Sequence, residues 1–304
     1  MNVAITGATG LLGAHFAAAL ATRHRVFGFD RHPWWAQADV KIQQGELADE
    51  GQRAAFIAAA DPELFIHCAA MVNVDACEER PAEAYFSNGS LPGLLARAAK
   101  PGCVFVYITT DGIFSGDAPM RRENDLPCPR TVYGRSKLHG EWETALSGRE
   151  HLIVRTNFYG WSSGLKQTSG EWLHAALAER RRITLFDDFW FTPLYVTELV
   201  ERVFALLSAG RRGTYHVVGA DRVTKYEFGQ QLADLAGYPM DNVQRGSIAS
   251  AALRAPRPRD MSLNAERTAR DTGLASPTCA DGIRRFLADR GRTLEERVAY
   301  LRAP

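Results

Sequence analysis

The stretch "VAITGATGLLG" at residues 3–13 decides the fold. Its apolar start predicts a buried strand, and residues 11–23 have the apolar spacing of a helix. Between the two, Gly7, Gly10 and Gly13 stand three residues apart. Such glycines allow a tight turn and bring a bare backbone beside a pyrophosphate, which then lies at the positive end of the helix. We predict a dinucleotide-binding turn with contacts from Gly7, Thr9, Gly10, Leu11, Leu12 and Gly13.

The same alternation of apolar strand and amphipathic helix continues through the first half of the chain. Continuous apolar strands separated by helices indicate a parallel sheet covered on both faces. We therefore predict an α/β fold with a doubly wound, Rossmann-type sheet. The expected strands are 25–29, 40–44, 64–68, 104–109 and 152–156, and the expected helices are 50–60, 81–100 and 136–148.

After residue 157 the rhythm changes, and a smaller, mostly helical C-terminal region is expected. We predict a dinucleotide-binding domain at 1–157, its sheet completed by parts of 183–220, and a substrate-binding region at 158–304 interleaved with that sheet. In this region we expect helices at 171–182, 197–209 and 224–237, strands at 183–186 and 213–219, and a proline-rich loop at 252–264. The tail at 293–304 is expected to pack on its own domain, with an interface helix as the alternative.

Composition narrows the class of protein. The 304 residues are 46% hydrophobic and 23% charged with a formal net charge of +1, so no charge bias points to nucleic acid or a membrane surface. The five cysteines lack metal-like spacing, which favours a reducing compartment, and no metal site is expected. No charged leader or apolar run of membrane length is present, so we expect a cytoplasmic protein.

An acidic residue ends the second predicted strand, in "FGFDRH" at 27–32. At this distance from the glycines, Asp30 suits a hydrogen bond to the ribose hydroxyls of NAD and would repel the 2′-phosphate of NADP. Arg31 and His32 could attract that phosphate. The sequence thus predicts an NAD(P)(H) cofactor with a slight preference for NAD(H).

The segment "TVYGRSK" at 131–137 places Tyr133 four residues before Lys137, on one helix face. We expect the ammonium to lower the pKa of the tyrosine, making it a proton donor or acceptor. Upstream, "YITTDGIFSG" at 107–116 ends a buried strand on hydroxyls and a carboxylate, where open α/β sheets bind ligands. Together these patterns favour a catalytic Tyr133 over a plain surface helix.

These residues resemble the extended short-chain dehydrogenase/reductase family, most of all its dTDP-4-dehydrorhamnose reductase branch. That branch typically reads "STDYVFDG" where this chain has "TTDGIFSG" at 109–116, and "YGxTK…GE" where it has "YGRSKLHGE" at 133–141. The resemblance spans almost the whole chain. Further matches lie at 67–78, 154–160, 215–237 and 257–264.

The resemblance implies roles for individual residues. Thr110 would be the hydroxyl that binds the substrate's carbonyl oxygen, Tyr133 the acid, and Lys137 the residue that holds the nicotinamide ribose. Asn88 would organise its helix or a proton relay, with a surface amide as the alternative. Further cofactor contacts are implied for Glu46, Leu47, Cys68, Ala69, Ala70 and Asn157, and substrate contacts for Thr110, Asp111, Gly112, Phe158 and Arg257.

Gly112 departs from the bulky residue of that branch, and we interpret it as extra room beside the sugar. A pyrophosphate would need donors such as the arginines predicted to cluster in a loop, and aromatic side chains could stack on a base or sugar. The arginines are Arg245, Arg254, Arg257 and Arg259, and the tryptophans are Trp34, Trp35, Trp161 and Trp190.

The expected function is the NAD(P)H-dependent reduction of a nucleotide-activated keto-deoxysugar. Two alternatives stay open. One is a nucleotide-sugar epimerase or dehydratase, for which Asp111 would be the acid. The other is a non-catalytic, NADP-binding regulatory subunit like that of methionine adenosyltransferase. A nucleotide sugar is the expected partner, and a homodimer is one expectation for the oligomeric state.

Overall fold

A parallel sheet forms the centre of the computed structural model, which describes residues 1–162, 164, 166–251 and 254–304. In this described part, seven strands pair in the order β11-β6-β5-β4-β1-β2-β3, and every neighbouring pair is parallel. The chain builds one half outward from β1, then returns to its other side at β4. The predicted doubly wound α/β fold is confirmed. The strands are β1 (Asn2–Thr6), β2 (Arg25–Asp30), β3 (Val40–Gln44), β4 (Leu64–His67), β5 (Val104–Thr110), β6 (His151–Thr156) and β11 (Gly213–His216).

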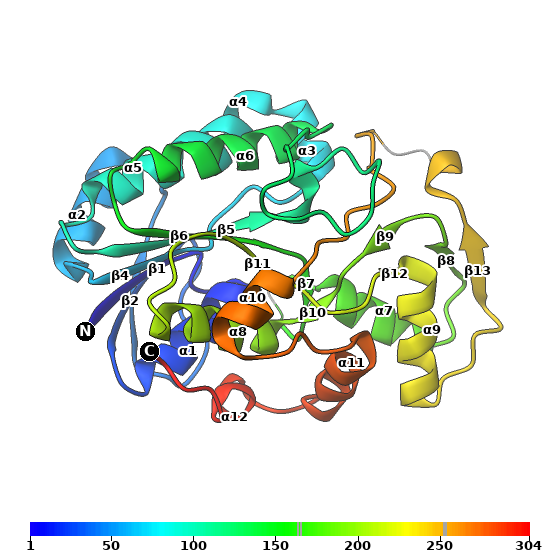
Figure 1. The fold of residues 1–304 in the computed structure, drawn as a ribbon. Helices are drawn as coiled ribbons and strands as arrows, with labels where there is room; N and C mark the ends of the chain where they lie inside the picture. Colours follow the sequence, from blue (N-terminus) through cyan, green and yellow to red (C-terminus); the bar gives the residue numbers. More distant parts are fainter. Residues whose placement is uncertain (163, 165, 252–253) are drawn as a thin grey trace.

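Helices cover both faces of this sheet (Figure 1). One face carries α2 (Glu50–Ala60), α5 (Leu91–Ala98) and α6 (Val132–Ala145). The other carries α1 (Leu11–Ala21), α8 (Val196–Ser208), α10 (Glu266–Thr272) and α12 (Leu294–Val298). Because both faces are covered, the central strands are apolar over most of their length, apart from polar residues near their ends, and bury residues such as Ile5, Ile66 and Val106. The tail packs on α1 of its own chain, and Pro304 O lies 2.8 Å from His24 Nε2.

The remaining C-terminal elements lie together at one end of the molecule, on the right of Figure 1. They include three helices, α7 (Ser169–Ala178), α9 (Lys225–Ala236) and α11 (Cys279–Ala288). Small two-stranded sheets lie beside these helices, and the sequence pattern does not predict them. Strand β8 pairs with β13 rather than joining the main sheet, so β11 is the strand of 183–220 that extends it. The pairs are β7 (Phe158–Tyr159) with β10 (Leu194–Tyr195), β9 (Trp190–Phe191) with β12 (Val223–Thr224), and β8 (Ile183–Phe186) with β13 (Val243–Gly246). Residues 252 and 253, at the start of the predicted loop, lie outside the described residues.

The long helix predicted at 81–100 is interrupted. It consists of α4 (Pro81–Ala84), a π-helical turn η1 (Tyr85–Ser90) and α5, preceded by a short helix α3 (Val74–Glu79). A π-turn leaves a carbonyl without its usual helical partner. Here Tyr107 Oη, from the neighbouring β5, donates to Asn88 O at 2.7 Å. The sheet therefore supports the widened turn.

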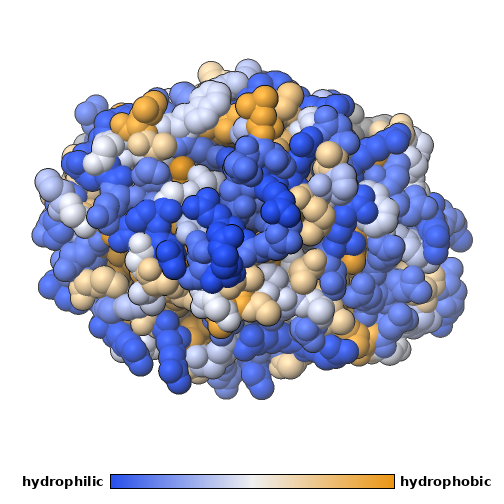
Figure 2. Space-filling model, viewed as in Figure 1, coloured by the Kyte–Doolittle hydropathy of each residue, from blue (hydrophilic) through white to orange (hydrophobic). Residues whose placement is uncertain are grey.

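The surface seen in Figure 2 is mainly hydrophilic, with hydrophobic residues in small groups, some of them over α4, α5 and α6. Trp142 on α6, Leu146 just after α6 and Leu94 on α5 are among the exposed large apolar side chains. None of the helices in the described ranges combines the length and the apolar character that crossing a membrane requires.

Candidate active site

The glycine turn after β1 leaves no space for a side chain at Gly7 or Gly13. A Cβ at Gly13 would lie 2.1 Å from Gly7 O, and one at Gly7 would lie 2.7 Å from Ala69 N. Gly7 also has φ +68°, a conformation that favours glycine. Gly10 is the N-cap of α1 and brings no side chain over the helix start, with Thr9, Leu11 and Leu12 around it. This cradle of bare backbone at a helix N-terminus fits the phosphates of a dinucleotide.

Asp30 lies beside this turn, at the end of β2. Its carboxylate accepts hydrogen bonds from Thr9 N at 3.1 Å and His32 N at 3.2 Å. Trp35 reaches the same place, because its Nε1 donates to Thr9 O at 3.2 Å. Arg31 is exposed next to Asp30. The structure thus brings the acidic residue and the glycine turn together, and adds an indole to them.

Two further segments flank the cradle. Cys68, Ala69 and Ala70 follow β4 and lie half-buried against Gly7. Burial raises the pKa of the Cys68 thiol to about 12, so it is a small apolar neighbour rather than a nucleophile. Glu46 is exposed, and Leu47 packs partly on the cluster around Phe29.

The carboxyl end of β5 carries a connected polar group. Thr110 Oγ1 donates to Asp111 Oδ1 at 3.0 Å and accepts from Gly112 N at 3.1 Å. Asn157 Nδ2, after β6, donates to Asp111 Oδ2 at 2.7 Å. Burial raises the pKa of Asp111 to about 6, although both hydrogen bonds and the charge of Lys225 oppose the shift. The link between Asp111 and Asn157 was not predicted, because it joins two strand ends.

Tyr133 and Lys137 lie on α6, whose N-cap Thr131 accepts from Gly134 N at 3.0 Å. The expectation that Lys137 lowers the pKa of Tyr133 is wrong. Burial raises that pKa, the charge of Asp111 adds to the shift, and a hydrogen bond with Thr110 opposes it.

The Lys137 ammonium is engaged elsewhere. Its Nζ donates to Ile108 O at 2.7 Å and lies 4.3 Å from the centre of the Tyr107 ring. Burial lowers its pKa to about 7, with Glu141 opposing the shift. Two N–H donors remain for other partners while Lys137 is protonated.

Asn88 is fully buried within η1, which excludes the alternative of a surface amide. Its Oδ1 accepts from Met71 N at 2.9 Å, and its Nδ2 donates to Met71 O at 3.0 Å and to Ser136 Oγ at 3.1 Å. Ser136 immediately precedes Lys137. Asn88 therefore ties the segment after β4 to the helix that carries Tyr133 and Lys137.

Gly112 does not open the room expected from the sequence. It is buried, and the Met261 methyl lies 3.3 Å from the position of a Cβ at residue 112. The thioether from the C-terminal region thus fills part of that space. Phe158 directly follows Asn157 in the sequence. It is half-buried and begins β7.

The predicted arginine cluster is dispersed. Arg245 lies on β13 over the ring of Tyr226. Arg254 pairs with Glu79, and Arg257 Nη2 lies 3.2 Å from Asp75 Oδ1. The other terminal nitrogen of Arg257, Nη1, is buried and has no hydrogen-bond partner in the described part of the chain. Arg257 is therefore the member of the set best placed to receive an anionic group.

The tryptophans mostly have structural partners. Trp161 stacks on Phe286 at 4.3 Å between ring centres, and the Arg222 guanidinium lies 3.8 Å over the Trp190 ring. Trp34 donates to Ala38 O at 2.8 Å. Trp35 alone of the four bonds to the glycine turn.

Lys225, the first residue of α9, was missed as a site residue. It lies close enough to Asp111 for each charge to shift the pKa of the other group. Its only sequence signal was its place inside the motif at 215–237. The nearness to Asp111 depends on how α9 packs, which a local pattern does not contain. Among the described residues no group of His, Cys, Asp and Glu side chains forms a metal site, and the five cysteines are free.

A parallel dinucleotide-type sheet, with a threonine, a tyrosine and a lysine gathered beyond its carboxyl ends, defines an extended short-chain dehydrogenase/reductase. Residues 1–291 match the family described as the RmlD substrate binding domain. The chain belongs to this family, whose members include dTDP-4-dehydrorhamnose reductases.

Curated relatives include reductases and a regulatory subunit. The chain is 31% identical over 289 residues to the probable low-salt glycan biosynthesis reductase Agl14 of Haloferax volcanii, covering 93% of this chain and 96% of the relative. It is 31% identical over 265 residues to dTDP-4-dehydrorhamnose reductase of Mycobacterium tuberculosis, covering 85% and 82%. It is also 30% identical over 277 residues to methionine adenosyltransferase 2 subunit beta of Pongo abelii, covering 86% and 80%.

Among solved structures, dTDP-4-dehydrorhamnose reductase of Bacillus anthracis in complex with NADP is similar, with a TM-score of 0.83 and 26% identity. The match covers 94% of this chain and 98% of that one.

Proposed function

We propose that this protein reduces the keto group of a nucleotide-activated deoxysugar with NADPH or NADH. The observation that carries the proposal is the joint placement of Thr110, Tyr133 and Lys137 beside a backbone cradle that fits a dinucleotide. Residues 1–157 hold the cofactor and residues 158–304 the sugar nucleotide in this proposal. The similarity to reductases of both glycan and dTDP-rhamnose synthesis supports it.

Reduction of a ketone requires a hydride at carbon and a proton at oxygen. The reduced nicotinamide, when bound, supplies the hydride. Because burial raises the pKa of Tyr133, its side chain is a protonated phenol at neutral pH and holds the required proton. Thr110, whose hydroxyl is close enough to Tyr133 to oppose this rise in pKa, would position the carbonyl oxygen beside the phenol. The raised pKa thus suits a proton donor for reduction.

Other residues hold the two ligands. The glycine turn would hold the cofactor phosphates, and the free N–H donors of Lys137 would bind the nicotinamide ribose. Asp30 gives a slight preference for NAD(H), since its carboxylate would repel a 2′-phosphate. On the sugar-nucleotide side, Asp111 accepts from a sugar hydroxyl and Arg257 Nη1 faces the pyrophosphate.

The test is an assay of nicotinamide oxidation with NADPH and with NADH over a panel of keto-sugar nucleotides, including dTDP-4-keto-6-deoxy sugars. We expect turnover with at least one, and a loss of roughly 10²- to 10⁴-fold in kcat for Tyr133→Phe. Tyr85→Phe is the matched control, because Tyr85 is exposed on η1 and should leave kcat unchanged. Absence of oxidation across the whole panel would overturn the proposal.

The second candidate is a regulatory subunit, favoured by the 30% identity to methionine adenosyltransferase 2 subunit beta. Stable co-purification with an adenosyltransferase, together with an inactive wild type, would support it. An epimerase or dehydratase would instead retain stoichiometric oxidised cofactor through purification. The assay of nicotinamide oxidation over the keto-sugar panel separates such an enzyme from a reductase.

A further inference from the structure

Lys225 presents a cation that the fold itself does not use. Its backbone N–H donates to Phe189 O at 3.2 Å, which fixes the residue at the start of α9. Its Nζ lies 3.4 Å from the ring centre of Phe191 and 5.3 Å from that of Phe189. In the described part of the chain, Nζ has no hydrogen-bond acceptor, and no carboxylate oxygen lies within 4.0 Å of it. All three N–H donors of the ammonium are therefore available.

This position disfavours a cation on structural grounds. The N-terminus of a helix is its positive end, so a lysine there is repelled by the helix dipole. The acidic residue of the first turn does not compensate, because Glu227 turns back to Thr224 N at 2.7 Å in a capping box. Burial lowers the pKa of Lys225 to about 8, and Asp111 opposes that shift. The aromatic rings recover part of the lost solvation.

Asp111 is the carboxylate whose charge acts on the Lys225 ammonium and stabilises its protonated form. Its two oxygens already accept from Thr110 Oγ1 and Asn157 Nδ2. A donor with no acceptor, Lys225, and an acceptor, Asp111, thus lie close enough for their charges to interact, and the acceptor is bonded to the hydroxyl of Thr110. A sugar ring with neighbouring oxygens presents the complementary acceptor and donor.

We propose that Lys225 is a substrate-binding residue whose ammonium donates to an oxygen of the sugar ring, so that the keto sugar is held between Lys225 and Asp111. The ligand class is a sugar with two adjacent oxygens, one accepting from the ammonium and one donating to the carboxylate. The inference rests on the proposed function and deepens it, since the site residues given above included no cation on the sugar.

The test compares Lys225→Met with Lys225→Arg, using the keto-sugar nucleotide that the wild type reduces. Methionine keeps the length and the contact with Phe191 but removes every donor, whereas arginine keeps the charge. We expect Lys225→Met to raise KM for the sugar nucleotide by roughly 10- to 100-fold, as loss of a charged hydrogen bond does. The Kd for NADPH should change less than about twofold, and Lys225→Arg should recover most of the sugar affinity.

Lys41→Met is the matched control. Lys41 also lies over an aromatic ring, with Nζ 5.6 Å from the centre of Phe27, but it is exposed on the edge strand β3. The Lys41→Met variant should bind and reduce the keto-sugar nucleotide like the wild type. Sugar-nucleotide binding to the protein loaded with oxidised cofactor, measured by calorimetry, should show the same ranking of variants as KM.

The outcomes separate the two proposals. An active wild type with an unchanged KM in Lys225→Met would overturn this inference and leave the reductase standing. A wild type that neither binds nor reduces any keto-sugar nucleotide would overturn both. Should Lys225→Met fail to fold, Lys225→Leu replaces it, because leucine also has no hydrogen-bond donor, and a wild-type KM in that variant would likewise overturn the inference.

Discussion

At Gly13 a single hydrogen in place of a side chain keeps α1 close to the turn after β1. The position of a Cβ there coincides with backbone, 2.1 Å from Gly7 O and 2.8 Å from Gly7 C, and backbone cannot rotate away. At Gly10 a Cβ would meet Gly7 O at 3.3 Å, which a small adjustment relieves. The three positions thus differ in how strictly they require glycine, and this difference is not visible in their even spacing along the sequence.

We expect Gly13→Ala to destabilise the protein by about 1–3 kcal/mol, as overpacking does, and to weaken dinucleotide binding at least tenfold. The second effect follows because α1 must move away from the phosphate cradle. Gly10→Ala is the matched control and should reduce both the stability and the dinucleotide affinity less than Gly13→Ala does. Urea unfolding and a fluorescence titration with NADPH measure the two quantities, and equal effects from the two alanines would contradict the explanation.

The contrast between Gly13 and Tyr133 shows what local sequence can predict about the site. The role of Gly13 follows from a turn between adjacent elements, and its predicted place beside the other glycines agrees with the geometry. The pKa of Tyr133 depends on burial and on Asp111, which belongs to another element. The helical spacing of Tyr133 and Lys137 indicates neither the burial of Tyr133 nor its nearness to Asp111.

At the scale of elements, η1 is where periodicity misleads. The apolar spacing over 81–100 predicts one helix, yet the π-turn interrupts it. The turn lets Asn88 reach Met71 and Ser136 while Gly140 of α6 lies against Asn88 O, where a Cβ would be only 2.1 Å away. The strand pattern, by contrast, predicted the sheet well because buried parallel strands are apolar throughout. The short strands β7, β9, β10 and β12 have two residues each, too few to show a pattern.

We expect Asn88→Ala to lower the free energy of unfolding by about 1–3 kcal/mol, because it removes the fully buried amide that bonds to Met71 N and Met71 O. The kcat of a Tyr133-dependent reduction should also fall, since α6 loses its tie to the segment after β4. Asn242→Ala, which removes an exposed hydrogen bond to Arg180 O, is the control and should change both quantities little. A wild-type unfolding curve for Asn88→Ala would refute the role of the π-turn.

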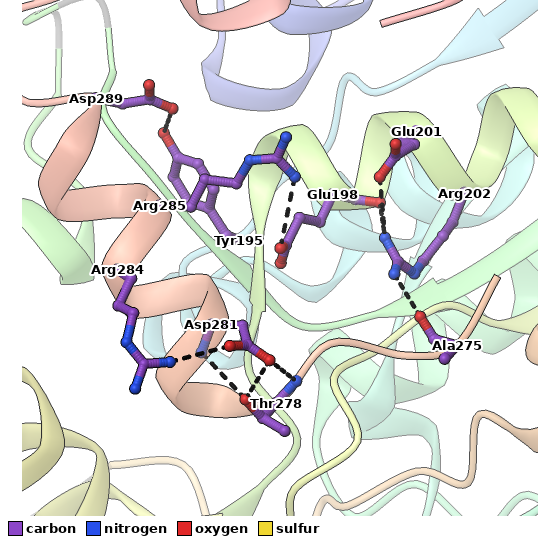
Figure 3. Close-up of polar contacts among 10 residues, drawn as sticks. All are labelled: Tyr195, Glu198, Glu201, Arg202, Ala275, Thr278, Asp281, Arg284, Arg285 and Asp289. Carbon is purple, nitrogen blue, oxygen red and sulfur yellow. Dashed lines mark hydrogen bonds and ion pairs between the residues drawn. The ribbon is translucent and has the colours of Figure 1, made fainter. Parts of the chain in front are cut away.

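At the scale of the whole molecule, buried polar contacts hold the C-terminal helices against the sheet layer. Glu198 of α8 points towards Arg285 of α11, with Oε1 and Nη1 3.7 Å apart (Figure 3). Next to these helices Tyr195 Oη, just before α8, donates to Asp289, just after α11, at 2.8 Å, and Arg202 of α8 donates to Ala275 O at 2.6 Å. Glu198 Oε2 has no hydrogen-bond partner among the described residues. No helical pattern in the sequence indicates that this carboxyl is buried.

Burial raises the pKa of Glu198 from 4.5 to about 7, with Arg202 and Arg285 opposing the shift and Glu201 and Asp281 adding to it. Because the folded-state pKa exceeds the unfolded one, the folded protein keeps this proton to higher pH. The stabilisation is complete below pH 4.5 and is lost as pH rises to about 7.

Glu198→Gln should therefore flatten the pH dependence of stability over that window. At about pH 8 the variant should be more stable than the wild type by on the order of 1–3 kcal/mol, since glutamine avoids a buried charge. Glu50→Gln, at an exposed carboxyl in the first turn of α2, is the control and should keep the wild-type slope. Urea unfolding at several pH values measures this, and parallel curves for wild type and Glu198→Gln would show that the carboxyl ionises freely in the fold.

The contact between Gly112 and Met261 has a consequence for how such proteins diversify. The strand end that carries Thr110 must keep its hydrogen-bond geometry, so it tolerates little change beside the reacting group. Met261 belongs to a distant loop with no such duty, yet its methyl occupies the space next to Gly112. In the proposed reductase, a substitution at Met261 would change the space beside Gly112 and leave Thr110 as it is, so the sugar preference could change without loss of the reaction.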